Sequence, residues 1–312
     1  MTAQAPLYDD IAGGPEGGVA HWVWTSDDIR IRLAHWPVPQ AKGTVLIFPG
    51  RTEFIEKYGR VARDFAARGF ASVTIDWRGQ GLADRLHPEQ GMGHVSDYRH
   101  YQRDVAAMLS YVAEQGLPQP LYILAHSMGG PIALRALIDG LEVKACGFSA
   151  PMWGIKGSSP LLAYAWSVST LAHFMGQTNR IVPGQHAGTY VLRQAFEGNT
   201  LTGDEASWDM LVDMAKKRPE LTLGGPSIAW LRSALHEMRR LHALPSPDVP
   251  CLTYLGTEED IVSPSRIKER MARWPNGKLH ILQGGRHEML MDKPEFRDTL
   301  LDGYTALFEA NT

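Results

Sequence analysis

The sequence predicts an α/β fold with a mostly parallel central sheet, helices on both faces of that sheet and an inserted helical cap. Two observations predict this class. Short continuous apolar runs alternate with helical patterns along most of the chain, which is typical of β-α-β units that build a buried parallel sheet. The alternation stops near Pro151 and resumes at Cys251. The residues between these points follow helical patterns only, so we expect a helical insertion there.

The first half of the chain supplies most of the predicted sheet. Residues 1–18 are rich in glycine, proline and small side chains, and we expect them to form a loose arm. Residues 22–24 are apolar, and residues 29–33 alternate apolar and charged side chains after a turn at 26–28, which predicts a hairpin. Continuous apolar runs predict buried strands at 44–48, 70–75, 121–124 and 143–148. Helical spacing of apolar residues predicts helices near 55–66, 97–114 and 130–138.

The second half completes the sheet after the insertion. Its pattern predicts a strand at 251–255, a helix near 265–273, a strand at 278–282 and a last helix from Pro294. We therefore divide the chain into the arm (1–18), a core (19–150 and 244–312) and a cap (151–243). The cap holds four of the nine tryptophans and five of the twelve methionines. This enrichment is consistent with an adaptable apolar binding surface or with a small core of the cap itself.

Composition excludes several classes of protein. Hydrophobic residues make up 44% and charged residues 21% of the 312 residues, which excludes a largely disordered chain. The net charge of −3 gives no indication of nucleic-acid binding, which usually needs a basic excess. Cys146 and Cys251 lie in apolar runs, so we expect buried free thiols in a reducing compartment. No cysteine and histidine cluster has zinc-site spacing.

Targeting signals are absent from the pattern as well. The N-terminal residues lack the basic start and apolar centre of a signal peptide, so we expect a cytoplasmic protein. Residues 157–179 contain no Asp, Glu, Lys or Arg. Because Ser, Thr, His and Gly interrupt this segment, we expect a buried or lid-like helix and not a membrane span.

The clearest chemical signal is the segment from Leu124 to Gly130, which reads LAHSMGG. It follows a predicted strand and opens a predicted helix, which is the context of a G-x-S-x-G nucleophile turn. Ala125 replaces the first glycine of that pattern. Small flanking residues let Ser127 sit on a tight, strained turn. The segment therefore makes Ser127 the candidate nucleophile.

A serine hydroxyl needs a base, and the base needs a group that orients it. His287 lies in a glycine-rich loop directly after the last predicted strand, where active sites of open α/β sheets form. The loop after strand 251–255 offers three carboxylates, Glu258, Glu259 and Asp260. The chain order of serine, acid and histidine is that of α/β-hydrolases.

These segments make the sequence resemble an α/β-hydrolase of the lysophospholipase and monoacylglycerol lipase branch, in particular the bacterial lysophospholipase type. The matching segments are residues 48–58, 76–81, 93–98, 123–130, 223–226 and 285–288. In that family the position of the acid, counted from Gly256 and from the Ile261-Val262 pair, falls on Glu259. Asp260 remains the alternative, through a slip of one residue, and Glu258 is favoured least. The resemblance also implies an oxyanion hole made by the backbone N–H groups of Arg51 and Met128.

The resemblance implies a serine hydrolase that cleaves carboxyl esters of a small lipid-like molecule, a lysophospholipid or a monoacylglycerol, through an acyl-enzyme. It implies no metal and no organic cofactor, and peripheral membrane contact would use residues 160–175. Two alternatives stay open: a peptidase of the same fold, which needs acidic cap residues such as those at 204, 205, 209 and 213, and a non-catalytic binding protein. The Arg51 side chain could meet a phosphate, but pairing with Glu53 or Glu56 is the favoured interpretation. For Arg78 and His126 we expect structural roles.

Overall fold

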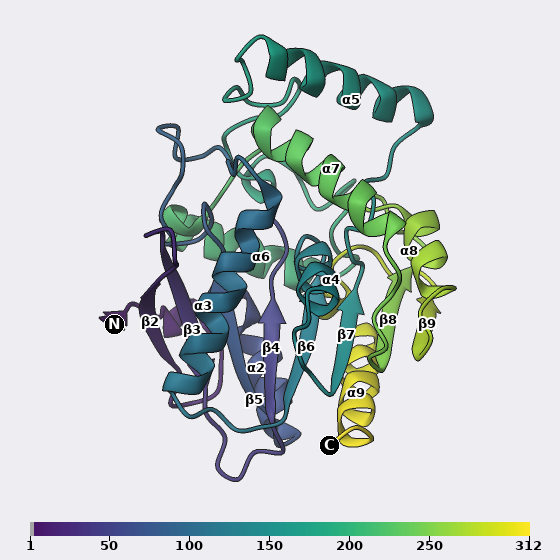
Figure 1. Ribbon diagram of the computed structural model, residues 1–312. Coiled ribbons are helices and arrows are strands. Elements are labelled where there is room, and N and C mark those ends of the chain that lie inside the picture. The colour runs from purple at the N-terminus through teal and green to yellow at the C-terminus, as the bar shows by residue number, and fades with distance from the viewer. Residues whose placement is uncertain (1–2) are drawn as a thin grey trace.

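A nine-stranded sheet runs through the computed structural model, which describes residues 3–312 (Figure 1). The strand order is β1-β2-β3-β5-β4-β6-β7-β8-β9. Strands β1 to β3 pair in antiparallel fashion, and β3 joins them to a parallel region that runs from β5 to β9. The predicted α/β class is thereby confirmed. The strands are β1 (Ala3–Ala5), β2 (Val19–Trp24), β3 (Arg30–Trp36), β4 (Thr44–Phe48), β5 (Ala71–Asp76), β6 (Leu121–His126), β7 (Ala145–Ser149), β8 (Cys251–Gly256) and β9 (Gly277–Leu282).

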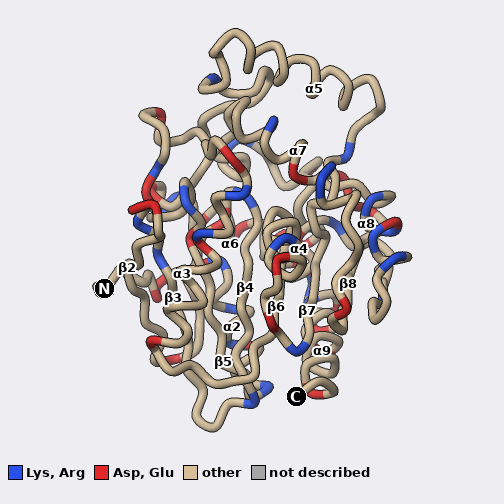
Figure 2. Tube along the Cα trace, viewed as in Figure 1, with Lys and Arg blue, Asp and Glu red and all other residues tan. Residues whose placement is uncertain are grey.

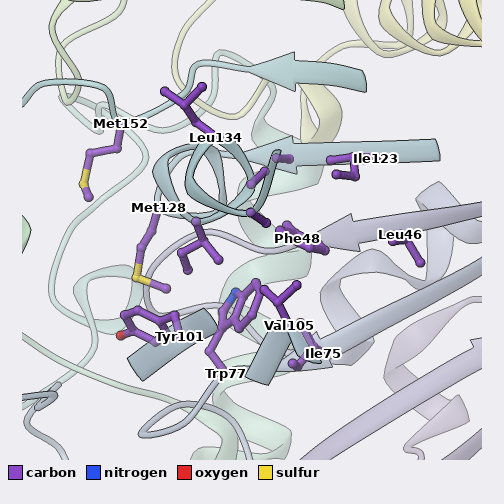
Figure 3. Close-up of a cluster of buried hydrophobic side chains, with 14 of the residues drawn as sticks. Leu46, Phe48, Ile75, Trp77, Tyr101, Val105, Ile123, Met128, Leu134 and Met152 are labelled. Carbon is purple, nitrogen blue, oxygen red and sulfur yellow. The ribbon is translucent and has the colours of Figure 1, made fainter. Parts of the chain in front are cut away.

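Helices cover both faces because the central strands are apolar on both sides. In β4, Leu46 and Phe48 face one core, and Val45 and Ile47 face the other, as the two-residue period of a strand requires. The helices that contribute to the first core include α3 (Tyr101–Glu114), α4 (Gly129–Ile138) and α8 (Pro264–Met271). Those of the second are α2 (Gly59–Ala67) and α9 (Pro294–Glu309). Figure 3 shows the first core, in which Phe48 meets the Trp77 ring edge-on at 5.2 Å between centroids.

The segment between β7 and β8 lies over the carboxyl ends of the parallel strands. It contains α5 (Ser159–Phe174), α6 (Glu205–Lys217) and α7 (Ile228–Ala243), and Figure 1 shows α5 and α7 above the strand ends. Short 3-10 turns complete the chain at η1 (Ile55–Tyr58), η2 (Tyr98–His100), η3 (Tyr190–Leu192), η4 (Pro219–Leu221) and η5 (Met289–Met291). Within residues 3–312, no helix combines the length and the apolarity that crossing a bilayer requires.

The N-terminal arm differs from the loose segment that we expected. Residues 1 and 2 lie outside the described residues, but β1 pairs with β2, and α1 (Asp9–Ala12) packs against the start of α2. The carbonyl of Pro6 accepts a hydrogen bond from the buried Arg32 guanidinium at 2.9 Å. Backbone pairing and one buried arginine therefore order a segment whose composition alone indicates a coil.

Candidate active site

Ser127 occupies the tight turn between β6 and α4. Its φ of 48° is in the left-handed region that residues with a side chain rarely adopt. Two further contacts hold the strained backbone, because the Ser127 carbonyl accepts hydrogen bonds from the N–H groups of Gly130 and Met152 at 2.9 and 2.8 Å. A Cβ on Gly129 would lie 2.1 Å from the Phe48 carbonyl oxygen. The small residues of the motif thus allow the helix to start directly against β4.

His287 and Glu259 reach Ser127 from two separate loops. The Nε2 atom of His287 lies 2.9 Å from the Ser127 hydroxyl, and Nδ1 lies 2.8 Å from Oε2 of Glu259. The other carboxylate oxygen of Glu259 accepts from the backbone N–H groups of Ile261 and Val262 at 2.7 and 3.0 Å. Burial raises the pKa of Glu259, but hydrogen bonds from His287 and these two N–H groups outweigh it and hold the pKa below its ordinary value. The carboxylate is therefore ionised, as a partner of an imidazolium must be.

The two neighbouring carboxylates point elsewhere. Asp260 pairs with Lys156 at 2.6 Å, and Glu258 pairs with Arg286 at 3.4 Å. Both carboxyl side chains are more than half exposed. Of the three carboxylates predicted as candidates, only Glu259 contacts His287 in the described chain.

The loop after β4 brings one backbone N–H group, that of Arg51, near Ser127, and the turn after β6 supplies a second, that of Met128. A Cβ on Gly50 would lie 3.1 Å from the Ser127 Cβ, so the next residue, Arg51, starts beside Ser127. Gln80 holds this loop from both sides, donating to the Gly50 carbonyl and accepting from the Thr52 N–H, both at 3.1 Å. Within residues 3–312, neither the N–H of Arg51 nor that of Met128 has an acceptor. Both remain free for a substrate oxygen.

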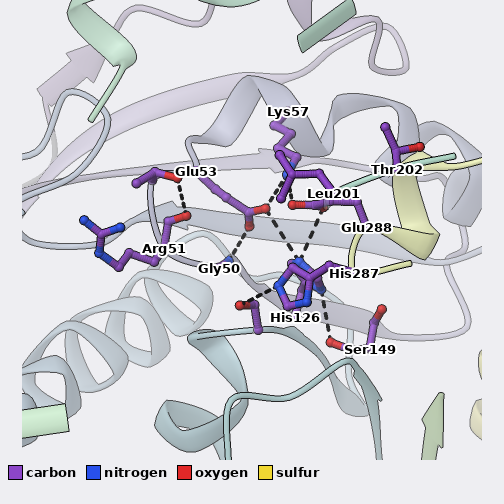
Figure 4. Close-up of polar contacts among 12 residues, drawn as sticks. Gly50, Arg51, Glu53, Lys57, His126, Ser149, Leu201, Thr202, His287 and Glu288 are labelled. Carbon is purple, nitrogen blue, oxygen red and sulfur yellow. Dashed lines mark hydrogen bonds and ion pairs between the residues drawn. The ribbon is translucent and has the colours of Figure 1, made fainter. Parts of the chain in front are cut away.

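Behind the histidine lies a buried ionic cluster that the sequence reasoning missed (Figure 4). We call Glu53, Lys57, His126 and Glu288 the ionic cluster. The Lys57 ammonium pairs with Glu53 and, at 2.8 Å, with Glu288, and the His126 Nε2 lies 3.4 Å from Glu288. Burial lowers the pKa of both Lys57 and His126, but the two carboxylates outweigh it and raise each pKa. One feature of the sequence pointed to this cluster: His126 directly precedes Ser127, and Glu288 directly follows His287.

The ionic cluster also contains the residues most suited to a metal. Ligand atoms of Glu53, His126 and Glu288 lie within 4.8 Å of one another. The Lys57 ammonium already supplies a positive charge to both carboxylates. The residues present therefore fit an internal ion-pair network and do not fit a metal site.

Arg51 forms neither of the ion pairs that the sequence favoured. Glu53 belongs to the ionic cluster, and Glu56 pairs with the buried Arg32 at 2.8 Å. The expected pairing of Arg51 was wrong, because Glu53 forms its ion pair with Lys57 and Glu56 forms its ion pair with Arg32. The Arg51 side chain instead donates to the Gly224 carbonyl of the cap. The guanidinium of Arg78 is buried and donates hydrogen bonds to Asp104 and Asp27, each at 2.8 Å. These contacts fit a structural role.

A cavity of about 440 Å³ opens above Ser127 and His287. Its cap wall is largely apolar, and no carboxylate of the cap lines it in the described chain. The acidic positions 204, 205, 209 and 213 lie outside this lining. The apolar side chains that line the cavity include Phe54, Met152, Ile155, Val182, Val191, Leu201, Leu211, Trp230, Leu231 and Ile261. Such a cavity suits an apolar ligand with a few polar groups at one end.

Comparison with known proteins identifies the family of this chain. Residues 39–294 match the Hydrolase_4 family, described as serine aminopeptidase, S33. The chain is 28% identical over 279 residues to the probable lysophospholipase L2 of Haemophilus influenzae, covering 88% of this chain and 87% of that protein. It is 29% identical over 292 residues to the lysophospholipase L2 of Escherichia coli, covering 90% and 85%.

A crystal structure of a soluble variant of monoglyceride lipase from Saccharomyces cerevisiae, in complex with a substrate analogue, superposes with a TM-score of 0.73 at 19% identity. The superposition covers 93% of this chain and 94% of that chain. At this identity the likeness shows a shared fold, whereas the family match extends over most of the sequence. The chain therefore belongs to the Hydrolase_4 family and is an α/β-hydrolase.

Proposed function

We propose that this hydrolase cleaves carboxyl esters of lipid-like molecules, lysophospholipids or monoacylglycerols, with Ser127 as nucleophile. The observation that carries the proposal is the chain of two hydrogen bonds from Ser127 through His287 to Glu259, at the base of a largely apolar cavity. The similarity to the two lysophospholipases L2 supports the lipid ester class. An apolar cavity wall supports it independently, because it can hold an acyl chain.

Each residue has a role in the proposed reaction. His287 Nε2 takes the proton from the Ser127 hydroxyl while Oγ attacks the ester carbonyl. The Arg51 and Met128 N–H groups donate to the oxyanion that forms, and Glu259 stabilises the imidazolium through Nδ1–H. His287 then gives the proton to the leaving alcohol oxygen, and an acyl-enzyme remains. Water attacks the acyl-enzyme by the same route, which releases the fatty acid and restores Ser127.

The peptidase alternative receives less support from the cavity. An aminopeptidase needs a carboxylate for the amino terminus of its substrate. The carboxylates that line the cavity, Glu53 and Glu288, already pair with Lys57, and the acidic cap positions lie outside it. A panel of p-nitrophenyl esters and aminoacyl p-nitroanilides separates the two activities, and preferred cleavage of the anilides would contradict the ester proposal.

The test of the proposal is Ser127→Ala. We expect this variant to lose ester turnover and labelling by a fluorophosphonate probe, while its melting temperature stays within a few degrees of the parent. Ser265→Ala, at an exposed serine of α8, is the matched control and should retain both. Full activity in Ser127→Ala would refute the assignment. A parent protein that is folded but neither active nor labelled would favour the non-catalytic binding protein.

We also propose that α5 is the part of the cap that contacts a lipid surface. The helix carries no Lys, Arg, Asp or Glu (Figure 2), and Phe174 is 82% exposed. A largely apolar pocket of about 270 Å³ beneath α5 shares four lining residues with the catalytic cavity: Ile155, Val182, Gln185 and Leu231. A lipid surface is the occupant that these features favour, because a chain leaving it could pass under α5 toward Ser127.

A further inference from the structure

Arg51 carries a charge that the protein does not neutralise. No carboxylate of residues 3–312 forms an ion pair with its guanidinium, and its side chain extends away from Glu53 (Figure 4). One hydrogen bond joins it to the Gly224 carbonyl, and its Nε–H is buried without an acceptor. The Trp230 ring lies 5.2 Å from the guanidinium carbon. Burial lowers the pKa of Arg51 to about 10, so the group is still charged at neutral pH.

Other arginines without a carboxylate show what a satisfied guanidinium looks like in this fold. Arg85 donates to the carbonyls of Gly79, Gly81, Glu220 and Thr222. Arg270 donates to the carbonyls of Leu241 and Leu244 and to the Ser246 hydroxyl. Neither side chain lines the catalytic cavity, whereas Arg51 does. Arg51 is only partly buried, but its Nε–H is fully buried without an acceptor, and a charge in such surroundings with unused donors is costly unless a ligand completes its partners.

The position of Arg51 restricts what that ligand is. Its own N–H is one of the two free donors beside Ser127, so the side chain starts next to the reacting carbonyl. In a lysophospholipid, one glycerol carries the acyl ester at one end and the phosphate diester at the other. A cation on the side chain of the residue whose N–H faces the oxyanion therefore suits the charge at the far end of that glycerol. Planar guanidinium groups bind phosphate oxygens through two parallel hydrogen bonds.

We propose that the Arg51 side chain binds the phosphate diester of a lysophospholipid substrate and so selects it over a monoacylglycerol. The inference rests on the proposed function of Ser127. On this proposal the polar end of the cavity has two parts. Arg51 binds the anion of the substrate, and the residues of the ionic cluster pair with one another. A monoacylglycerol leaves the Arg51 donors without a partner, and the difference between the two substrates is the quantity to measure.

The kinetic test compares two substrates with the same acyl chain in identical detergent micelles, 1-acyl-lysophosphatidylethanolamine and 1-monoacylglycerol. Arg51→Met should lower the lysophospholipid to monoacylglycerol ratio of kcat/KM by about 10- to 100-fold, mainly through KM of the lysophospholipid. The ratio for Arg51→Lys should fall between the ratios of the parent and of Arg51→Met, because lysine keeps the positive charge but lacks the two parallel N–H donors of a guanidinium. Since the N–H of residue 51 remains in each variant, any change in the oxyanion hole affects both substrates and cancels in the ratio.

Arg85→Met is the matched control, because Arg85 also ties the cap to the core through carbonyls but lies outside the cavity lining. We expect it to leave the ratio unchanged. An unchanged ratio in Arg51→Met would overturn the inference. A ratio that falls equally in Arg85→Met would also overturn it, because the effect would then come from cap attachment.

Binding to Ser127→Ala separates this inference from the proposed function. An ether-linked lysophospholipid should bind at least tenfold more weakly when Arg51→Met is added, whereas a 1-O-alkylglycerol should show no such loss. Inorganic phosphate is the third probe, and Arg51-dependent binding as tight as that of the ether lipid would indicate a free-anion site and overturn the headgroup assignment. A parent protein that hydrolyses neither lipid would refute the proposed function, and this binding comparison would still decide the role of Arg51.

Discussion

Glu259 illustrates how one carboxylate among three adjacent ones becomes the partner of His287. The N–H groups of Ile261 and Val262 hold one of its oxygens, which leaves the other to face Nδ1. Asp260 pairs with Lys156 instead, and Glu258 pairs with Arg286. The difference lies in the turn that follows β8, which directs the middle side chain inward.

Replacing these carboxylates one at a time tests that geometry. We expect Glu259→Gln to reduce kcat by about 10³- to 10⁴-fold, because an amide cannot stabilise the imidazolium and favours the wrong tautomer. Asp260→Asn removes only an exposed ion pair, which contributes little, and kcat should stay near that of the parent. Steady-state kinetics on one ester substrate measures both. If Asp260→Asn, and not Glu259→Gln, showed this large loss of kcat, Asp260 would be the residue that orients His287.

Sequence motifs located the proposed catalytic residues better than the residues that surround them. The Ser127 turn and the His287 loop each have a local signature, and the structure places both side chains within hydrogen-bond distance. The ionic cluster has no such signature, because Glu53 and Glu288 are distant in sequence and meet only in the fold. The partner of Arg51 was mispredicted for the same reason. Proximity along the chain favoured Glu53, whereas Lys57, one helical turn later, pairs with it.

At the scale of secondary structure, the close contact between α1 and α2 depends on Gly59. A Cβ at this position would lie 2.2 Å from the Ala12 carbonyl oxygen. Gly59→Ala should therefore destabilise the protein by about 1–3 kcal/mol and lower the melting temperature, with little change in kcat/KM. Gly157→Ala is the control, because its added methyl would meet side chains at an ordinary 3.4 Å. Equal melting temperatures for the two variants would show that the arm does not pack in this way.

The β2–β3 hairpin contains a histidine whose burial makes stability depend on pH. Nδ1 of His35 lies 2.7 Å from the Tyr111 hydroxyl, which also contacts His21 at 2.8 Å. Burial, together with His21, lowers the pKa of His35 from 6.5 to about 4. Because the unfolded chain binds the proton more readily, this stability is complete above the unfolded pKa and is lost as the pH falls from about 6.5 toward 4.

The corresponding measurement is the free energy of unfolding at two pH values. His35 should account for a loss of about 2 kcal/mol between about pH 8 and pH 5. His35→Gln should therefore lose less stability over this interval than the parent, whatever its stability at pH 8. His280→Gln, at an exposed histidine of β9, should keep the parental pH dependence. A parental pH dependence in His35→Gln would assign the effect to other groups.

Elements with a long periodic pattern were predictable, and short ones were not. Strand β4 falls on the predicted residues, and the predicted helix from Pro294 corresponds to α9. The three residues of β1 and the four of α1 are too short to show a period. Their order comes from backbone pairing with β2 and from contacts with Arg32 and Gly59, which no local pattern reports.

For the whole molecule, the position of α5 leads to a prediction about lipid surfaces. The Ser127→Ala protein, which does not consume lipid under the proposed mechanism, should sediment with lysophospholipid-containing vesicles. The double variant Leu171→Glu with Phe174→Glu should weaken this binding about tenfold or more, because both side chains are exposed and apolar. Ile281→Glu changes an exposed apolar residue of β9 and should bind as before. If Ile281→Glu weakened vesicle binding as much as the double variant, α5 would not be the contact surface.

The ionic cluster has a consequence for exchanging parts between related enzymes. His126 precedes Ser127, Glu288 follows His287, and Glu53 and Lys57 belong to the segment after β4. Consider a chimera in which only one of these three segments comes from a relative with different charged residues. A carboxylate or an ammonium group would then be buried without an ion-pair partner. Successful grafts, and the natural drift of such sequences, should therefore replace all three segments together.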